Sequence, residues 1–511
     1  MLDQNPPSNR AANGASRLVP HLAVDARGAV EVARAAQSDW ASRSLDHRAS
    51  AITRAAKAML ADRSTIVRLV KEEMGKHEVE GLFTEGLGHL DAVQSWKKVV
   101  AKELARSVPL NPINFPKKRA RVELVPRGVV GVIAPWNFPV AGLYRSLMPA
   151  LLLGNAVVLK PSEHTPRSSA WFADHLAREL PHGVVQVVQG DGSVGAALVA
   201  SGIDACVFTG SVAGGASVRR RCAELGIPSS IEMGGKDAAI VFADCDLWRT
   251  VAGITHWALS NSGQACGAIE VAYVEETIAD AFVTRLRYVW EKLRTGPGAA
   301  DVDVSPVANE KQLAIIEAHV ADALKKGATL VTGGKRTVGL GYLPTLLDRC
   351  TDAMDVVREE TFGPVLAVVR VRGADEAVQA INRAQYGLGA SVWTSDVARG
   401  ERIAARLDVG IASVNNHAFT GAVAALPWSG TRATGYGIAN GPWSLTTFAR
   451  PKVMVVDESD GPEIFWMPFD ADLGKLGEAL ADAQIGRVLG AWRIPLLLRS
   501  RLRTLRRFFG G

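Results

Sequence analysis

The first hundred residues carry apolar side chains at a helical period. One stripe runs through Val30, Val32, Ala33, Ala36 and Trp40, and a second runs through Ile52, Ala55, Ala56, Met59 and Leu60. Because residues three and four apart share one face of a helix, these stripes predict a helical opening from Ala23 to about Arg106. The polar residues ahead of it, 1–22, predict a flexible lead-in without the apolar run of a signal peptide.

From residue 128 onward, short apolar runs alternate with helical patterns. The run 128–134 is continuous, which is typical of a strand buried on both faces of a parallel sheet. Further strands are predicted at 156–159, 184–188, 205–208 and 228–232, with helices at 142–153, 168–180 and 196–201 between them. This alternation predicts an α/β protein with a doubly wound sheet.

The alternation restarts after a helix predicted at 248–260. A second α/β domain over about 271–426 is predicted from strands at 270–274 and 329–332, helices at 278–293 and 310–326, and a strand that begins within 359–365.

Residues 451–457 predict a further strand, and 119–125 alternates as an exposed edge strand does. Basic side chains at 117–121 suit such an edge. A nucleic-acid patch is the alternative, but interleaved aromatic side chains are missing, so we expect no nucleic-acid partner.

Composition narrows the class of protein. With 511 residues, 48% of them hydrophobic, and 49 glycines, the chain is long enough for two or three domains with many tight turns. The five cysteines form no Cys-x-x-Cys pair and the histidines show no ligand spacing, so we expect a reducing compartment and no metal. No run of about 18 apolar residues predicts a membrane-spanning helix.

One cysteine has the surroundings of a nucleophile. Cys266 lies between Ala265 and Gly267, so a carbonyl group and two backbone N–H groups have room to approach its sulfur. The alternative is a small buried hydrophobe, which is the usual role of a free cysteine.

Two further side chains follow predicted strands, where α/β proteins place ligands. The amide of Asn137 can donate to an oxyanion, although a turn residue is the alternative. Glu232 precedes two glycines, which suits a general base that faces a cleft.

Two other strand ends suggest a nucleotide site. Lys160 and Glu163 can each hold one ribose hydroxyl, although a solvated charged turn is as good an interpretation. Thr209-Gly210-Ser211 opens a helix whose N–H groups can receive a diphosphate. The fingerprint Gly-x-Gly-x-x-Gly is absent, and packing glycines would look the same.

Six motifs in order give the chain its family resemblance. Over 23–457 it resembles the aldehyde dehydrogenase superfamily through Pro135-Trp136-Asn137-Phe138-Pro139, Lys160-Pro161-Ser162-Glu163, Phe208-Thr209-Gly210-Ser211, Glu232-Met233-Gly234-Gly235-Lys236, Gly263-Gln264-Ala265-Cys266 and Glu360-Thr361-Phe362-Gly363-Pro364. The resemblance implies a Rossmann-type cofactor domain, an α/β catalytic domain and a small β element for oligomerisation.

The resemblance also implies boundaries. We expect a cofactor-binding domain at 23–240 with bridging strands near 110–126, a catalytic domain at 241–430, a return with an oligomerisation strand at 431–457, and a basic extension at 458–511. A homodimer or homotetramer is expected.

The resemblance implies the following roles. Cys266 attacks an aldehyde, Asn137 and the Cys266 N–H hold the oxyanion, and Glu232 activates the water that hydrolyses the thioester. The expected cofactor set is Trp136, Lys160, Glu163, Thr209, Gly210, Ser211, Gly215, Met233, Glu360 and Phe362. NAD is expected rather than NADP, because a carboxylate at 163 repels a 2′-phosphate.

Rival functions are a coenzyme A-acylating dehydrogenase, which Glu232 disfavours, and a non-catalytic membrane-associated scaffold, which the intact Cys266 and Asn137 disfavour.

One segment beside the substrate entrance departs from the family pattern, Pro427-Trp428-Ser429-Gly430-Thr431-Arg432. Arg145 meets either an acidic substrate or, as we expect, a structural carboxylate.

The end of the chain is basic and amphipathic. Residues 485–511 contain no acid and the arginines 487, 493, 499, 501, 503, 506 and 507, with Leu498, Leu502, Leu505 and Phe509 expected on the opposite face. This segment predicts either peripheral contact with an anionic membrane or a helix docked on the protein itself. Membrane contact would favour lipophilic or long-chain aldehydes, and a cytoplasmic protein at the inner face of a membrane.

Overall fold

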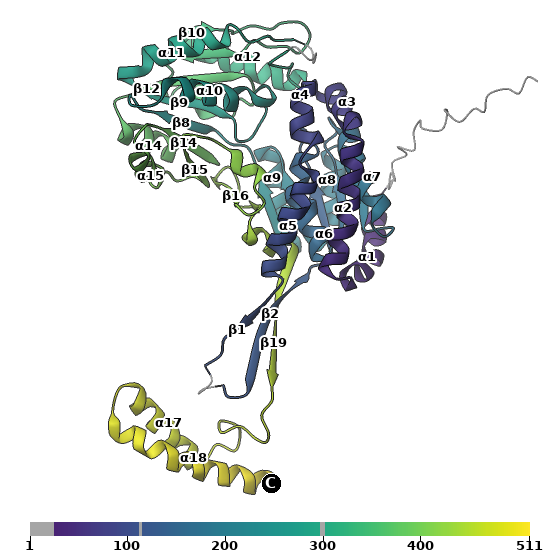
Figure 1. Ribbon diagram of the computed structural model, residues 1–511, viewed down its shortest axis with the longest axis vertical. Helices are drawn as coiled ribbons and strands as arrows, with labels where there is room; N and C mark the ends of the chain where they lie inside the picture. The colour runs from purple at the N-terminus through teal and green to yellow at the C-terminus, as the bar shows by residue number, and fades with distance from the viewer. Residues whose placement is uncertain (1–24, 112–114, 297–301, 511) are drawn as a thin grey trace, which may run out of the picture. The chain divides into compact units, whose positions relative to one another are not determined.

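The computed structural model describes residues 25–111, 115–296 and 302–510 (Figure 1), so the predicted lead-in lies outside the described residues. By their internal contacts the residues divide into two units. Of the described residues, those up to 105 and those within 123–452 form one unit, and those within 106–122 and from 453 onward form the other.

The helical opening is confirmed as four long helices, α1 (Ala26–Ser42), α2 (Leu45–Ala61), α3 (Arg63–Met74) and α5 (His89–Glu103). Between α3 and α5 lie the short α4 (Glu78–Gly81) and a π-helix, η1 (Leu82–Gly86). Val30, Ala33 and Trp40 are buried as the period predicts, but Val32 is exposed, because it lies off the inward face of α1.

The first sheet is fully parallel, in the order β5-β4-β3-β6-β7. Its strands are β3 (Val129–Ile133), β4 (Ala156–Lys160), β5 (Val185–Val187), β6 (Ala205–Thr209) and β7 (Ser229–Glu232). Helices α2, α5, α6 (Tyr144–Leu153) and α7 (Pro166–Glu179) cover one face, and α1, α8 (Gly192–Ala200) and α9 (Val212–Leu225) cover the other. The order reverses at β3, and such a switch point is where doubly wound sheets bind ligands.

The second sheet has the order β10-β11-β12-β9-β8-β14-β15, parallel except for β10. Its strands are β8 (Asp237–Val241), β9 (Ile269–Glu275), β10 (Thr329–Thr332), β11 (Thr345–Asp348), β12 (Val365–Val371), β14 (Gly389–Trp393) and β15 (Ile411–Val414). Helices α10 (Leu247–Leu259) and α11 (Glu276–Trp290) cover one face, and α12 (Glu310–Lys325), α13 (Asp355–Arg358) and α14 (Ala374–Arg383) cover the other.

Strand β8 does not appear among the predicted strands, because its five residues follow the Gly234-Gly235 turn without a helix between β7 and β8. The smaller elements of the first unit are α15 (Val397–Ala404), α16 (Leu445–Phe448), β13 (Tyr386–Gly387), β16 (Trp428–Ser429), β17 (Thr431–Arg432) and β18 (Ile438–Ala439).

A three-stranded sheet in the order β1-β2-β19 contains both predicted bridging segments. Its strands are β1 (Ala105–Val108), β2 (Lys118–Pro126) and β19 (Ala449–Asp457).

The second unit contains a helical hairpin, α17 (Ala471–Gln484) and α18 (Val488–Phe509). The predicted amphipathic helix is confirmed, but two details are wrong. Arg501 is fully buried, where it donates to Asp470 (2.8 Å) and to the Ile464 carbonyl (2.9 Å). Leu505 packs inward while Leu502 is exposed, because α17 covers only one side of α18. No helix in the described ranges is both long enough and apolar enough to cross a membrane.

Candidate active site

The structure brings the predicted catalytic residues together around the carboxyl ends of β3, β6 and β7. A pocket there is lined by Pro135, Arg145, Thr209, Ser230, Glu232 and Ile438, among others. Strand β7 ends at Glu232, and Asn137 lies in the loop that follows β3. Cys266 lies within electrostatic reach of both Glu232 and Arg145.

The loop that carries Cys266 has an unusual backbone. Asn261 and Ser262 have φ of 51° and 56°, and Gly263 follows at 73°, all in the left-handed region. A side chain at Gly263 would meet the Gly363 carbonyl at 2.0 Å. Gln264 holds the turn, since its Nε2 donates to the Asn261 carbonyl (3.0 Å) and its Oε1 accepts from Ala308 N–H (2.8 Å). Hydrogen bonds thus fix the strained turn just before the thiol.

Burial raises the pKa of the Cys266 thiol to about 12. The Arg145 charge opposes the shift, while Asp237, Glu232 and Glu360 add to it. Cys266 packs against a cluster of buried apolar side chains, Leu388, Ile411, Trp428 and Ala439. The thiol is therefore protonated at neutral pH and needs a base before it can act as a nucleophile.

Glu232 has the properties of such a base. The side chain is buried, and no hydrogen bond to it is found within the described ranges. Burial raises its pKa to about 7, against the lowering effect of Arg145. A carboxyl group that titrates near neutral pH can both accept a proton and release it.

Arg145, on α6, does not meet the structural carboxylate that we expected. Its guanidinium lies over the Trp428 ring, 4.5 Å from the ring centre, and the described part of the chain contains no ion pair with it. The position beside Cys266 and Glu232 leaves its charge to act on the catalytic pair. Trp428 belongs to the segment that departs from the family pattern.

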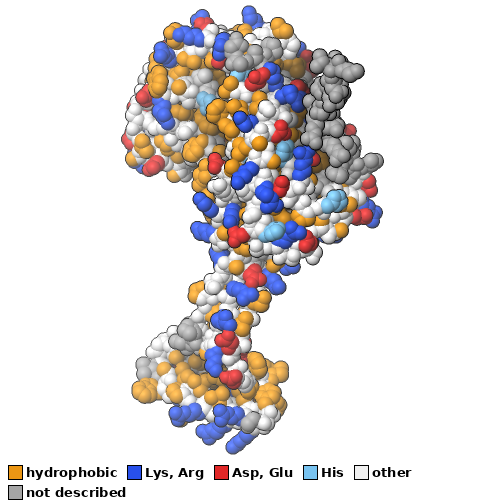
Figure 2. All heavy atoms as spheres, turned by 45° about the vertical axis from the view of Figure 1, so that its right-hand side comes forward, with side chains coloured by type: hydrophobic (Ala, Val, Ile, Leu, Met, Phe, Trp, Pro, Cys, Tyr) orange, Lys and Arg blue, Asp and Glu red, His pale blue; other side chains and the backbone are white. Residues whose placement is uncertain are grey.

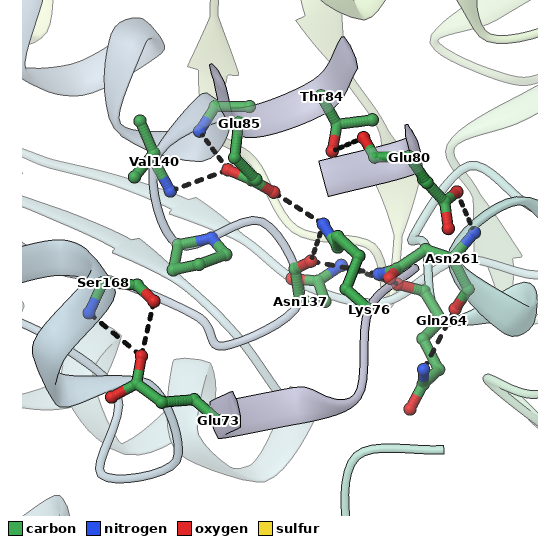
Figure 3. A network of polar contacts seen from close by, with 12 residues as sticks. Glu73, Lys76, Glu80, Thr84, Glu85, Asn137, Val140, Ser168, Asn261 and Gln264 are labelled. Carbon is green, nitrogen blue, oxygen red and sulfur yellow. Dashed lines mark hydrogen bonds and ion pairs between the residues drawn. The ribbon is translucent and has the colours of Figure 1, made fainter. Parts of the chain in front are cut away.

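Asn137 is buried, and polar contacts fix it from several sides (Figure 3). Its Nδ2 donates to the Gln264 carbonyl (3.0 Å), two residues before Cys266. The backbone carbonyl of Asn137 accepts hydrogen bonds from Asn261 Nδ2 and from Lys76 Nζ, each at 3.0 Å. Since a side-chain amide has two N–H groups, one remains for a substrate oxygen.

The predicted ribose pair lies at the end of β4. Lys160 is buried, Glu163 is exposed, and Lys160 Nζ lies 3.2 Å from Glu163 Oε2. Partial burial raises the pKa of Glu163, but hydrogen bonds from its own backbone N–H and from Lys160 outweigh this and lower it. The carboxylate is therefore charged at neutral pH.

The predicted diphosphate site lies where β6 leads into α9. Ser211 caps this helix by accepting from Gly214 N–H (3.2 Å), and Thr209 and Gly210 precede the cap. Gly215 and Met233 form a packing contact instead: a side chain at Gly215 would lie 2.5 Å from the Met233 sulfur. This contact holds α9 against the end of β7.

Of the remaining three cofactor candidates, Glu360 and Phe362 come from the loop before β12, and Trp136 comes from the loop after β3. Glu360 Oε1 accepts from Gly235 N–H (3.0 Å), and burial, followed by the Glu270 charge, raises the pKa of Glu360 to about 8. Phe362 has φ of 51° and its ring meets that of Trp136 edge-on, 5.5 Å between centres.

Sequence reasoning missed the residues that support this loop and the Asn137 loop. Glu270 accepts from the backbone N–H groups of Thr361 and Phe362, both at 2.8 Å, and pairs with the buried Lys236. Lys76, between α3 and α4, and Glu85, in η1, do the same for the Asn137 loop. Their only signal in the sequence is a charge within a helical region, which predicts a solvated face.

The sequence profile described as "Aldehyde dehydrogenase family" matches residues 18–454. One relative, the 4,4'-diapolycopene aldehyde oxidase of a Methylomonas species, is 35% identical over 84% of this chain and 82% of that protein. Among solved structures, the NAD+ complex of an aldehyde dehydrogenase from Bacillus cereus is 29% identical, with a TM-score of 0.80 over 85% of this chain and 89% of that one. NADP-dependent glyceraldehyde-3-phosphate dehydrogenase from Bacillus halodurans, complexed with NADP, is 35% identical, with a TM-score of 0.78 over 85% and 91%. The chain therefore belongs to the aldehyde dehydrogenase family, oxidoreductases that act on aldehydes.

Proposed function

We propose that this enzyme oxidises an aldehyde to the carboxylic acid through a covalent thioester on Cys266. The observation that carries the proposal is the meeting of Cys266, Asn137 and Glu232, which come from three separate loops and strand ends. Among them they supply a nucleophile, an oxyanion donor and a base.

In the first step Glu232 takes the proton of the thiol, and the sulfur attacks the aldehyde carbon. The carbonyl electron pair moves to oxygen, where the second N–H of Asn137 and the Cys266 backbone N–H hold the negative charge. A bound nicotinamide cofactor supplies the hydride acceptor. As the carbonyl re-forms, the hydride leaves the carbon, the thioester remains, and Glu232 releases the first proton to solvent. Glu232 then takes a proton from water, whose oxygen attacks the thioester carbon. The C–S bond breaks, the acid leaves, and Glu232 returns its proton to the thiolate.

We propose NAD as the cofactor. Lys160 and Glu163 would hold its ribose, and Thr209, Gly210 and Ser211 would receive its diphosphate at the start of α9, a helix of 14 residues. Glu360, Phe362 and Trp136 would line the nicotinamide end, while Gly215 and Met233 support the helix. The charged Glu163 disfavours a 2′-phosphate, although solved relatives bind NAD or NADP.

The test is NADH formation at 340 nm with the purified chain and a panel of aldehydes, without coenzyme A. Cys266→Ala should abolish turnover, and Glu232→Gln should slow both the first burst of NADH and steady turnover, because Glu232 is the base in both steps. Cys245→Ala, at a second half-buried thiol, is the matched control. Turnover that requires coenzyme A would support the acylating alternative instead.

We further propose that α18 contacts an anionic membrane surface. Trp492, Leu496, Arg499, Arg503 and Arg506 recur at helical spacing and are all exposed. Figure 2 shows basic and apolar side chains together on this unit. Arg493, Arg499, Arg503, Arg506 and Arg507 have no ion pair with any described residue. Each arginine near such a surface adds about 1 kcal/mol of binding free energy.

Contact of this kind favours lipophilic or long-chain aldehydes in the cytoplasm, at the inner face of a membrane. The test is cosedimentation with phosphatidylglycerol and with phosphatidylcholine vesicles. Replacing Arg499, Arg503 and Arg506 by Gln should abolish binding to the anionic vesicles, whereas Gln at Arg27, Arg372 and Arg383, exposed arginines of the other unit, should not. A change in oligomeric state without vesicle binding would show that α18 instead contacts a second subunit; we expect a homodimer or homotetramer.

A further inference from the structure

A ten-residue segment from Lys76 to Glu85 supports the active site from the helical opening. The two side chains are fully buried, and Lys76 Nζ lies 2.6 Å from Glu85 Oε1. Neither residue faces the pocket described above, and neither enters the proposed chemistry. Removing two charges from water costs free energy, so a fully buried ion pair is expected to have a role that offsets this cost.

The pair holds the Asn137 loop at the asparagine and in the residues that follow it (Figure 3). Glu85 Oε2 accepts from the backbone N–H groups of Val140 (3.0 Å) and Ala141 (2.8 Å). Lys76 Nζ donates to the Asn137 carbonyl and lies 4.2 Å from the centre of the Phe138 ring. The loop is thus tied immediately at Asn137 and again three and four residues later.

The same segment also holds the loop of the nucleophile. Glu80 accepts a hydrogen bond from the backbone N–H of Asn261, within the strained turn that precedes Cys266. Glu80 lies in α4, and Glu85 lies in the π-helix η1 that follows it directly. One short segment therefore reaches two loops.

An apolar pair of similar volume would often stabilise the fold as well as a buried ion pair does. It would not make the three hydrogen bonds to the Asn137 loop. We propose that Lys76 and Glu85 are positioning residues, which set the Asn137 amide at the distance from Cys266 that oxyanion binding requires. This inference rests on the function proposed above.

The test is a mutant cycle on the full chain with an aldehyde that the unmodified enzyme oxidises. Lys76→Met/Glu85→Leu removes the pair without leaving a lone buried charge, and should lower kcat about 100-fold, since removal or misplacement of an oxyanion donor costs that much. KM for the cofactor should not change. The rate at which iodoacetamide alkylates Cys266 should not change either, because that reaction forms no oxyanion.

In an Asn137→Ala background the same double substitution should cause no further loss of kcat, because the pair acts through Asn137. Lys71→Met/Glu78→Leu, at a half-exposed pair that joins α3 to this segment, is the matched control and should leave kcat unchanged. Equal losses with and without Asn137, or a parallel loss of alkylation and cofactor binding, would overturn the inference. An unmodified enzyme that oxidises no aldehyde would overturn the proposed function instead.

Discussion

At the scale of single residues, burial gives the two catalytic groups opposite tasks. It raises the pKa of the Cys266 thiol to about 12 and that of Glu232 to about 7, so that the proton rests on sulfur and the carboxyl group can take it. Arg145, stacked on Trp428, opposes both shifts. None of this can be read from residue types, because burial depends on neighbours from distant parts of the chain.

The raised pKa of Glu232 predicts the pH profile. A base works only when deprotonated, so kcat should rise with pH through about 7, whereas an ordinary glutamate would give a limb near 4.3. Glu232→Gln should remove this limb and lower kcat at least 100-fold. Arg145→Met should move the limb to higher pH, because the guanidinium lowers the pKa of Glu232. Profiles of kcat between pH 5.5 and 8.5 measure both effects, and a limb near pH 7 that survives in Glu232→Gln would assign it to another group.

At the scale of elements, close contacts with other loops explain why the turn between β7 and β8 contains two glycines. A side chain at Gly234 would lie 2.2 Å from Glu360 Oε2, and one at Gly235 would lie 2.5 Å from the Cys266 carbonyl. The sequence suggested that these glycines leave the backbone exposed around the general base, Glu232. The structure adds that these glycines allow two other loops to approach that backbone closely.

Gly235→Ala should therefore displace the loop that carries Cys266. We expect kcat to fall at least tenfold, because the new methyl group collides with backbone that cannot move away alone. Gly28→Ala, on α1 with no atom within 4 Å, is the control and should leave kcat unchanged. The measurement is kcat with the best aldehyde of the panel, and equal values for the two variants would contradict the argument.

The regular elements were the most predictable part of the chain. Alternating apolar runs and helical periods were enough for β3 to β7, because strands buried on both faces have continuous apolar sequences. Strand β8 was missed because it follows β7 without the intervening helix that the alternation implies. The π-helix η1 could not be predicted, because nothing in five residues distinguishes it from an α-helical turn.

At the scale of the whole molecule, the site combines residues that lie far apart in the sequence. The motifs suggested Cys266, Asn137 and Glu232 because each follows a recognisable strand or helix. Lys76 and Glu85 carried no such signal, because their role depends on a loop 55 to 61 residues later. In the extension, helical spacing predicted α18, but the burial of Arg501 depends on Asp470, outside the segment considered.

The late arrival of the residues around Cys266 has a consequence during synthesis. The side chains that pack against Cys266 extend from Leu388 to Ala439, so the ribosome makes them roughly 5 to 35 s after the cysteine. Until then the thiol has an ordinary pKa near 8.5 and far more of it is thiolate, the form that peroxide oxidises. We therefore expect peroxide to react faster with the nascent chain than with the folded enzyme, in which burial raises the pKa of the thiol.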